Sequence, residues 1–288
     1  MQKRTRQFGG VRMPEHLSEA LAHALLSQEN IDLNIVEETG STNDDLKAIA
    51  RRRAFERPYF LSAKRQTCGR GTQGRCWHTA SLSLLFSLGI GLQAGAVQGL
   101  LSIAVGLGVA DAARNFGLGV QLKWPNDIWT ARGKAGGILC ETVRDPYGDT
   151  SLIIGVGCNL KIDAGGMTTN GWPITDLAQA GGGLLVESTT SRTAFLCGMV
   201  LAILSRFDRL MAGDMQTLLA DWAVADAFFG REVCWTSCIG SEEQRGIDRG
   251  IDSLGRLIIE PLSSNAEISK ERLFLSGELS ALTNQRNG

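Results

Sequence analysis

A loop rich in glycine and arginine is the first sign of chemistry in the sequence. Gly69, Gly71 and Gly74 form the pattern G-x-G-x-x-G, with Arg70 inside the pattern and Arg75 directly after it. Glycines let backbone N–H groups come close to a ligand, and guanidinium groups bind phosphate or carboxylate oxygens. The loop therefore predicts binding of a phosphate-containing ligand, although a solvated surface loop would be rich in the same residues.

The surroundings of this loop exclude two common families that carry the same glycine pattern. In a dinucleotide-binding fold the loop opens a helix, and an acidic residue follows about twenty residues later. Here residues 75–78 lead towards another strand, and residues 79–110 contain no acidic or basic side chain. The chain also lacks the HRD and DFG triplets of protein kinases.

Length and composition indicate an ordinary globular chain with two domains. The 288 residues exceed one average domain, and the chain is 43% hydrophobic and 20% charged. With 29 Lys and Arg against 30 Asp and Glu, the net charge of -1 excludes a protein that binds polyanions over its whole surface. Seven cysteines without a CxxC pair argue against a zinc ribbon and a fully paired disulfide framework, and favour a reduced, cytoplasmic protein.

Neither a secretory signal nor a membrane span is expected. The first seven residues are followed by no apolar stretch. Residues 79–110 lack charge and would be long enough to cross a bilayer, but Gly89, Gly91, Gly95 and Gly99 interrupt them. We therefore expect a buried strand at 82–90, a loop at 91–95 and a core helix from about 97 to 116.

Local patterns predict the other elements that position the glycine loop. Alternating apolar residues at 31, 33 and 35 indicate a strand, and Ser41 with Thr42 before two acidic residues indicates a helix N-terminus. Further strands are expected at 59–63, 120–123, 137–143 and 151–158, as in a mixed or mostly antiparallel sheet. Helices are expected at 17–26, 191–211 and 215–227.

The pattern changes near Gly230. Short strands are expected at 232–239, 244–251, 257–260 and 272–279, and residues typical of turns separate them, which indicates a small β-barrel. The predicted organisation is an N-terminal extension at 1–30, an α/β domain at 31–229 and a β-barrel domain at 230–288.

Five short motifs follow one another between residues 38 and 160. They are Glu-Thr-Gly-Ser-Thr-Asn at 38–43, Gln-Thr-Cys-Gly-Arg-Gly-Thr-Gln-Gly-Arg-Cys-Trp at 66–77, Lys-Trp-Pro-Asn-Asp at 123–127, Gly-Lys-Ala-Gly-Gly-Ile-Leu at 133–139 and Gly-Val-Gly-Cys-Asn-Leu at 155–160. This ordered series closely resembles biotin protein ligases, the biotin–[acetyl-CoA-carboxylase] ligases. The resemblance is close over residues 36–160 and weak in the C-terminal barrel.

The resemblance implies a fold and a reaction. The fold is α/β (α+β), with a class II synthetase-like mixed-sheet catalytic domain and a small C-terminal SH3-like β-barrel. The enzyme is expected to use ATP and Mg²⁺ to convert biotin to biotinyl-5′-AMP, and to transfer biotin to one lysine of a biotin carboxyl carrier protein. Residues 1–30 are too short for the DNA-binding domain of some relatives, so no DNA binding is expected. Exposed sheet edges would allow a homodimer.

The resemblance also assigns residues to the two substrates. Those matched to biotin binding are Ser41, Thr42, Asn43, Gln66, Arg70, Gly71, Thr72 and Lys134. Those matched to ATP and the adenylate are Gly69, Arg70, Gly74, Arg75, Lys123, Asn126, Asp127, Lys134, Asn159 and Trp172. Catalytic roles fall on Lys134, which is expected in a loop, and on Arg70 and Arg75, while Asp127 is expected to organise Mg²⁺.

Ordinary structural roles remain alternatives for several of these residues. Ser41 and Thr42 suit a helix N-cap, residues 123–127 suit a plain turn, and Trp172 suits core packing as well as a lid over the adenine. The sequence also departs from the family. Many relatives have a basic residue at the position of Thr72 or Gln73, and relatives often have arginine where this chain has Leu282.

Two other functions stay open on the sequence alone. A lipoate ligase has a related fold and the same acyl-adenylate chemistry, and a non-catalytic module would bind biotin without transferring it. The Gly-Arg-Gly loop and the motif at 123–127 favour biotin over lipoate. Arg70, Arg75 and Lys134 favour an enzyme, because biotin binding alone would not require these cations.

Overall fold

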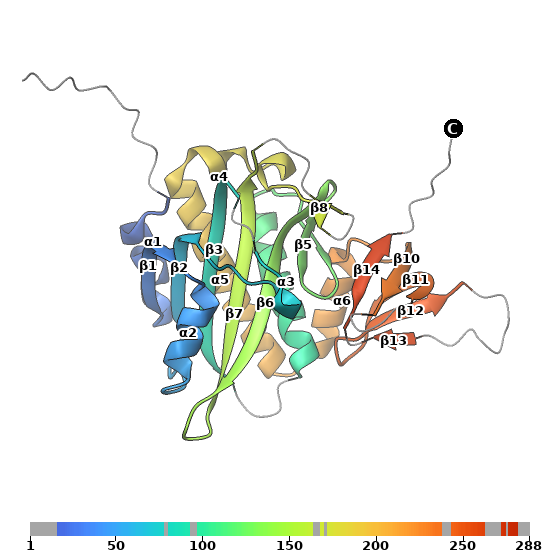
Figure 1. Cartoon of the computed structure of the whole chain (residues 1–288), viewed down its shortest axis with the longest axis horizontal. Helices are drawn as coiled ribbons and strands as arrows, with labels where there is room; N and C mark the ends of the chain where they lie inside the picture. The colour runs from blue at the N-terminus through green and yellow to red at the C-terminus, as the bar shows by residue number, and fades with distance from the viewer. Residues whose placement is uncertain are drawn as a thin grey trace, which may run out of the picture.

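The computed structural model describes residues 16–77, 80–92, 97–163, 168–169, 172–237, 243–262, 272–274 and 276–281. Within these ranges the chain forms a seven-stranded mixed sheet with helices, and a separate five-stranded antiparallel sheet (Figure 1). This arrangement confirms the predicted α/β fold with a small C-terminal β unit.

The elements have the following bounds. The large sheet contains β1 (Asp32–Thr39), β2 (Tyr59–Gln66), β3 (Leu82–Leu92), β4 (Gln121–Lys123), β5 (Asp127–Thr130), β6 (Gly133–Arg144) and β7 (Thr150–Lys161). The helices are α1 (Glu19–Leu26), α2 (Thr42–Ala50), α3 (Gln98–Asn115), α4 (Gly183–Glu187), α5 (Thr189–Met211) and α6 (Met215–Ala225), with short 3-10 turns η1 (Ser27–Glu29), η2 (Thr72–Gly74) and η3 (Ala178–Ala180). The small sheet contains β10 (Glu232–Thr236), β11 (Glu243–Ile251), β12 (Leu257–Pro261), β13 (Arg272–Phe274) and β14 (Glu278–Ala281), and β8 (Thr168–Thr169) pairs with β9 (Trp172–Pro173).

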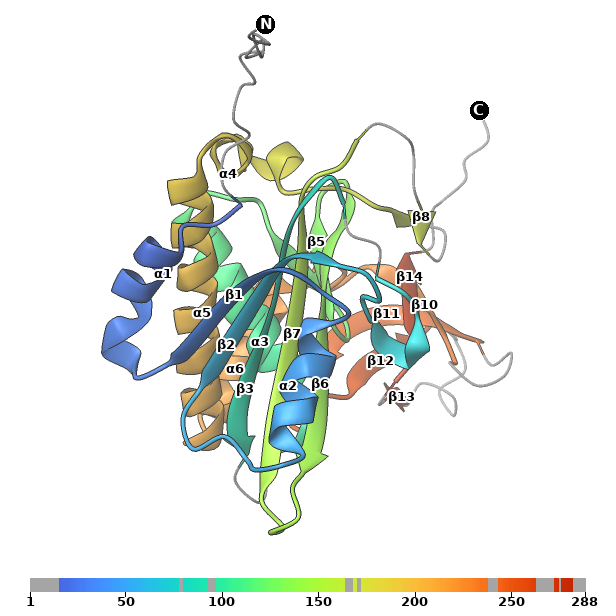
Figure 2. The ribbon, with the colours of Figure 1, turned by 60° about the vertical axis from the view of Figure 1, so that its left-hand side comes forward.

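The large sheet has the order β1-β2-β3-β7-β6-β5-β4. Strands β1 and β2 are parallel, and every later pair of neighbours is antiparallel. Helices α3 and α5 lie behind the sheet in the view of Figure 1, whereas α2 lies on the opposite face, as Figure 2 also shows. One face of the sheet therefore carries the helical core, and the other is left for α2 and the glycine loop between β2 and β3.

The uncharged segment 79–110 becomes a strand and a buried helix, as predicted. Helix α3 is buried on most of its surface between the sheet and α5. Gly108 permits the close contact with α5, since a Cβ there would lie 2.7 Å from the Cα of Ile203. Strand β3 extends to Leu92, and residues 93–96 of the predicted loop lie outside the described residues. No helix within the described ranges is long and apolar enough to cross a membrane.

Strand β6 begins earlier than the sequence predicts. The strand starts at Gly133 and not at residue 137. Lys134 therefore lies in a strand, and the prediction that it lies in a loop is wrong. Gly136 pairs tightly with β7, because a Cβ on Gly136 would lie 2.6 Å from the carbonyl oxygen of Gly157. These glycines allow two strands to approach closely, a role that local sequence does not distinguish from a loop.

The strand predicted at 272–279 is also wrong, since it is divided into β13 and β14. Gly277 between them has a φ of 151°, and a Cβ there would collide with the ring of Trp235. The indole N–H of Trp235 donates to the Ser276 carbonyl oxygen over 3.1 Å. The contact with the Trp235 ring therefore determines where β13 and β14 are separated, and the local sequence pattern does not contain this information.

A hydrogen bond joins the two domains, since the indole N–H of Trp124 donates to the Gly255 carbonyl oxygen over 3.1 Å. The segment between α6 and β10 is also bonded to the large sheet, since the Ala227 N–H donates to the Leu122 carbonyl oxygen over 2.8 Å. The chain leaves α6 for β10 through Gly230, whose φ is 74°. The domain limits at 30 and 230 stay predictions, and residues 1–15 of the predicted extension lie outside the described residues.

Candidate active site

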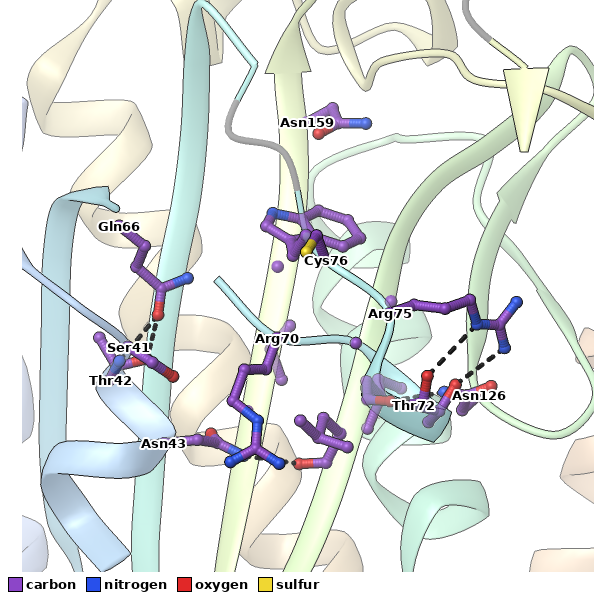
Figure 3. A pocket seen from close by; sticks show the side chains of 18 of the residues that line it. Ser41, Thr42, Asn43, Gln66, Arg70, Thr72, Arg75, Cys76, Asn126 and Asn159 are labelled. Carbon is purple, nitrogen blue, oxygen red and sulfur yellow. Dashed lines mark hydrogen bonds between the residues drawn. The ribbon is translucent and has the colours of Figure 1, made fainter. Parts of the chain in front are cut away.

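A cavity of about 400 Å³ lies on the α2 face of the large sheet, next to the glycine loop (Figure 3). All five sequence motifs contribute to its lining. The predicted site residues that line it are Ser41, Thr42, Asn43, Gln66, Arg70, Gly71, Thr72, Arg75, Asn126, Lys134 and Asn159. The predicted site residues Gly69, Gly74, Lys123, Asp127 and Trp172 lie outside this lining.

The start of α2 and the end of β2 form a neutral polar wall. Ser41 caps the helix, since its Oγ accepts from the Asp44 N–H over 3.5 Å, as the sequence predicts. The backbone N–H of Thr42 donates to Gln66 Oε1 over 2.7 Å, which fixes the Gln66 side chain beside the helix. This wall offers hydroxyl and amide groups without net charge.

Asn43 lines the cavity, but its polar atoms bond to the protein. Its Nδ2 donates to Glu141 Oε2 over 2.9 Å and to the Leu139 carbonyl oxygen over 3.3 Å. Its Oδ1 accepts from Ser87 Oγ over 2.6 Å. A direct amide contact with a ligand would break one of these bonds, so the structure favours an indirect role. Sequence reasoning missed Glu141 and Ser87, because neither lies in one of the five motifs.

The glycine loop folds back on itself as a narrow hairpin. The Gly71 N–H donates to the Arg75 carbonyl oxygen over 2.8 Å, and the Trp77 N–H donates to the Gly69 carbonyl oxygen over 2.9 Å. A Cβ on Gly69 would lie 2.7 Å from the Trp77 carbonyl oxygen. Gly69 therefore serves the closure of the hairpin, and Gly74 provides the left-handed turn at its tip with a φ of 74°.

The two arginines of this loop are paired with acids from other elements. Arg70 Nη1 lies 2.7 Å from Asp44 Oδ1 on α2, and Arg70 Nη2 lies 3.5 Å from Glu141 on β6. Burial alone would raise the pKa of Asp44, but hydrogen bonds from Lys47 and Arg70 hold it below its ordinary value.

Arg75 bonds within the loop and to the small sheet. Its Nη2 donates to Thr72 Oγ1 over 3.1 Å, and its Nη1 lies 2.7 Å from Glu278 Oε1 on β14. Both arginine side chains stay about 40% exposed. They can therefore exchange these acids for a ligand anion at little cost.

A buried carboxylate holds Lys134 in place. Lys134 Nζ lies 2.5 Å from Asp127 Oδ1, and Lys123 Nζ lies 3.2 Å from Asp127 Oδ2. Burial would raise the pKa of Asp127, but the charges of Lys123 and Lys134 outweigh it and hold the pKa below its ordinary value. Lys123 also lies 5.6 Å from the centre of the Trp129 ring. Asp127 thus pairs with two ammonium groups and leaves the three side chains with a net positive charge, and of the two lysines only Lys134 reaches the cavity.

These contacts do not favour the predicted magnesium role of Asp127. Both of its oxygens already accept from ammonium groups, and the side chain does not line the cavity. Among the described residues, no group of three His, Cys, Asp or Glu side chains could hold a metal ion. The protein side chains therefore do not fit a magnesium site at this position.

The two predicted asparagines are held by backbone groups. Asn126 Nδ2 donates to the Ile138 carbonyl oxygen over 2.7 Å, and Asn159 Nδ2 donates to the Thr175 carbonyl oxygen over 3.2 Å. Asn159 lies in β7, two residues before the strand ends. Both side chains line the cavity, and these bonds to backbone carbonyl groups fix their orientation.

Two tryptophans differ in their relation to the cavity. Trp77 lines the cavity, and its buried indole N–H has no hydrogen-bond partner within the described part of the chain, so a ligand could accept from it. Trp172 instead packs edge-on against Trp129, with ring centres 5.1 Å apart, and against Phe228 at 5.6 Å. The core-packing alternative for Trp172 therefore applies in this structure, and no lid is formed by it.

Known proteins are similar to this chain in both sequence and fold. The sequence model of the biotin/lipoate A/B protein ligase family matches residues 36–160. The biotin–[acetyl-CoA-carboxylase] ligase of Mycobacterium tuberculosis is 32% identical over 236 residues, which cover 79% of this chain and 83% of that protein. The bifunctional ligase/repressor BirA of Escherichia coli is 32% identical over 203 residues. These residues make up 69% of this chain but only 60% of BirA.

A solved structure supports the fold independently. The biotin protein ligase from Aquifex aeolicus, in complex with biotin and ATP, matches with a TM-score of 0.66 over 86% of this chain and 97% of that chain, at 24% identity. Sequence and fold thus agree, and the cavity is built from the motifs that first suggested the resemblance. The chain belongs to the biotin/lipoate A/B protein ligase family and, within it, to the biotin protein ligases.

Proposed function

We propose that this protein is an ATP-dependent biotin–[acetyl-CoA-carboxylase] ligase. The observation that carries the proposal is the division of one cavity into a neutral polar wall and a cationic wall. Ser41, Thr42 and Gln66 form the first wall, while Lys134 and Arg70 belong to the second. A ligand with an uncharged hydrogen-bonding ring and a carboxylate, joined to a phosphate, matches both walls.

The reaction has two steps. A carboxylate oxygen of biotin attacks the α-phosphorus of ATP, and the bond to the β-phosphate oxygen breaks to release pyrophosphate. The neutral amine of a carrier lysine then attacks the acyl carbon of biotinyl-5′-AMP, loses a proton and displaces AMP. The carrier is proposed to be a biotin carboxyl carrier protein, and the cysteine content suits a cytoplasmic location.

Lys134 has the clearest catalytic position. Its ammonium group lies in the cavity and is fixed by Asp127, so it can offset the repulsion of two anions without first having to be ordered. Arg70 and Arg75, on the hairpin over the cavity, are proposed to bind phosphate oxygens and to exclude water that would hydrolyse the adenylate. Mg²⁺ is expected to enter with ATP, and no protein ligand is proposed for it.

The polar wall favours biotin over lipoate. A ureido ring offers two N–H donors and one carbonyl acceptor, which Ser41, Thr42 and Gln66 can satisfy. The dithiolane ring of lipoate has no N–H or carbonyl group, so the donors and acceptors that these side chains still offer towards the cavity would have no ligand partner, and unpaired buried polar groups cost about 1–3 kcal/mol each. Biotin is therefore the proposed substrate, and the lipoate ligase alternative is disfavoured.

The proposal can be tested with biotin, lipoate, ATP, magnesium and a purified biotin carrier domain. We expect pyrophosphate release with biotin but not with lipoate, and a mass increase of the carrier by one biotinyl group. Lys134→Ala should lower biotin-dependent pyrophosphate release by about 10²-fold, the scale for losing one transition-state donor. Lys64→Ala is the control, because Lys64 is exposed and lies outside the cavity lining. Normal adenylation in Lys134→Ala would refute the role of this lysine.

A further inference from the structure

Behind the polar wall, hydrogen bonds connect Glu141 on β6 with Thr42 at the start of α2. Asn43 Nδ2 donates to Glu141 Oε2 and to the Leu139 carbonyl oxygen, over 2.9 and 3.3 Å. Ser87 Oγ, on β3, lies 2.6 Å from Asn43 Oδ1 and 2.7 Å from Thr42 Oγ1. Ser87 and Glu141 do not line the cavity, so this series links the cavity to residues behind its wall.

The number of available protons determines the direction of each bond. The amide nitrogen of Asn43 must face Glu141 and Leu139, because a carboxylate and a carbonyl only accept. Asn43 Oδ1 therefore faces Ser87 and takes the single hydroxyl proton of that serine. Gly155 leaves the space for this arrangement, since a Cβ at that position would collide with Asn43 Oδ1.

Thr42 must then provide the proton between its own oxygen and that of Ser87. Two hydroxyl oxygens 2.7 Å apart form a hydrogen bond only if one of them donates, and Ser87 has no proton left. A second acceptor for Thr42, Gln66 Oε1, lies 3.1 Å away. In both arrangements the Thr42 proton points to the protein, so towards the cavity Thr42 Oγ1 can only accept.

We propose that Ser87 is a positioning residue that makes Thr42 an acceptor and thereby selects a ligand N–H at this point of the cavity. The inference rests on the proposed function, because the ureido ring of biotin supplies such an N–H. Donors for the ureido carbonyl stand nearby. Ser41 Oγ uses only a lone pair in the helix cap, and Gln66 Nε2 makes no hydrogen bond within the described residues.

This polarity selects a cyclic urea over a cyclic carbamate, in which oxygen replaces one ring N–H. A ring oxygen opposite Thr42 would bring two acceptors together, unless Thr42 gave up its bond to Ser87 or Gln66. Either outcome leaves a buried polar group unpaired and should cost about tenfold or more in kcat/KM. Without the Ser87 hydroxyl, the Thr42 proton can turn to the ring oxygen more easily, and the discrimination should fall.

The test uses two carbamate analogues of biotin, one for each ring nitrogen. The measured quantity is kcat/KM for pyrophosphate release, expressed as the ratio of biotin to each analogue. We expect the wild-type protein to reject at least one analogue by about 10²-fold, and Ser87→Ala to reduce that ratio about tenfold. A general loss of stability or activity cancels in this ratio, so a purely structural role of Ser87 would leave it unchanged.

Ser62→Ala is the matched control. Ser62 is also buried in the sheet, but its hydroxyl donates to the Leu85 carbonyl oxygen over 3.0 Å, so this variant should keep the wild-type ratio. Ser87→Cys is a second variant of similar volume, and its weakly accepting sulfur should lower the ratio in part. Equal ratios in the wild-type protein and both Ser87 variants overturn the inference, as does a wild-type protein that uses both carbamates as well as biotin. Failure to release pyrophosphate with biotin itself would instead refute the proposed function.

Discussion

Two carboxylates buried between the sheets make the stability of this protein depend on pH. Asp248 on β11 is fully buried, and its Oδ1 accepts from the Gly250 N–H over 2.7 Å while its Oδ2 has no partner within the described residues. Asp226, which ends α6, accepts from the indole N–H of Trp222 over 3.1 Å and from the Phe228 N–H over 2.9 Å. Neither carboxylate has a cation among these partners.

The direction of the pH effect follows from the pKa values. Burial and, next, the charge of Asp226 raise the pKa of Asp248 from 3.8 to about 7. Burial likewise raises the pKa of Asp226 from 3.8 to about 6. The unfolded chain loses these protons near pH 4, whereas the folded chain keeps them. The contribution of the two protonated carboxyl groups to stability is therefore complete below pH 4, and it is lost as the pH rises through their folded-state pKa values of about 6 and 7.

Asp248→Asn should remove most of this loss. A pKa raised from 3.8 to about 7 corresponds to about 4 kcal/mol at pH 8. Side chains and water relax around a buried charge, so the real cost of ionising Asp248 should be about half of this value. We therefore expect Asp248→Asn to raise the free energy of unfolding by roughly 2 kcal/mol at pH 8. At pH 4, where the carboxyl group is protonated in the folded chain, the substitution should change the free energy of unfolding little.

Urea denaturation at pH 5 and pH 8 measures this effect. Asp248→Asn should be stabilised relative to the wild-type protein by more at pH 8 than at pH 5. Asp208→Asn is the control, because Asp208 is exposed on α5 and the substitution changes the net charge equally. The same pH dependence in Asp248→Asn as in the wild-type protein would contradict the reasoning.

Three further predictions concern the cavity and its hairpin. Arg70→Gly removes the ion pair with Asp44 that holds the hairpin, so biotinyl-5′-AMP should escape and label bystander lysines; labelling of the carrier alone, seen by mass spectrometry, would contradict this. Gly157→Ala places a Cβ 2.9 Å from the Trp77 ring and should push the ring into the cavity, which should lower kcat/KM for biotin about tenfold. An unchanged kcat/KM would show that the ring can move aside. Biotin should also tighten binding of a non-hydrolysable ATP analogue by about 1–3 kcal/mol in calorimetry, because ordering of the hairpin is shared; equal affinities with and without biotin would exclude this coupling.

Local sequence signals predicted the parts of the fold that depend on neighbouring residues. The cap at Ser41 fixed the start of α2, and the uncharged segment marked a buried strand and helix, because both signals act within a few residues. The ordered motifs also brought most of the proposed site residues to one cavity. Short-range patterns therefore located the site before its geometry was known.

Contacts that depend on strand register or on the second sheet could not be predicted. Asp127 lies between two lysines only because β4, β5 and β6 pair in one register, and its buried position argues against the magnesium role expected from its type. The pair of Arg75 with Glu278 joins residues some two hundred positions apart. Core packing was one of two possible roles for Trp172, but its aromatic partners Trp129 and Phe228 lie in two other segments and could not be identified from the sequence around it.

The proposed cations of the site differ in how firmly the protein holds them, and this difference suggests a division of labour. Lys134 is bonded to a carboxylate that is almost fully buried, so releasing the lysine would break a charge-assisted hydrogen bond in a buried site and leave Asp127 with Lys123 alone, which costs about 1.5–3 kcal/mol. Arg70 and Arg75 pair with acids at the surface, where an ion pair contributes about 0–1 kcal/mol. A phosphate can therefore displace the acids from the two arginines but not Asp127 from Lys134. The lysine is a fixed electrostatic support for the reacting groups, whereas the arginines can move with the hairpin as it closes over an anionic intermediate.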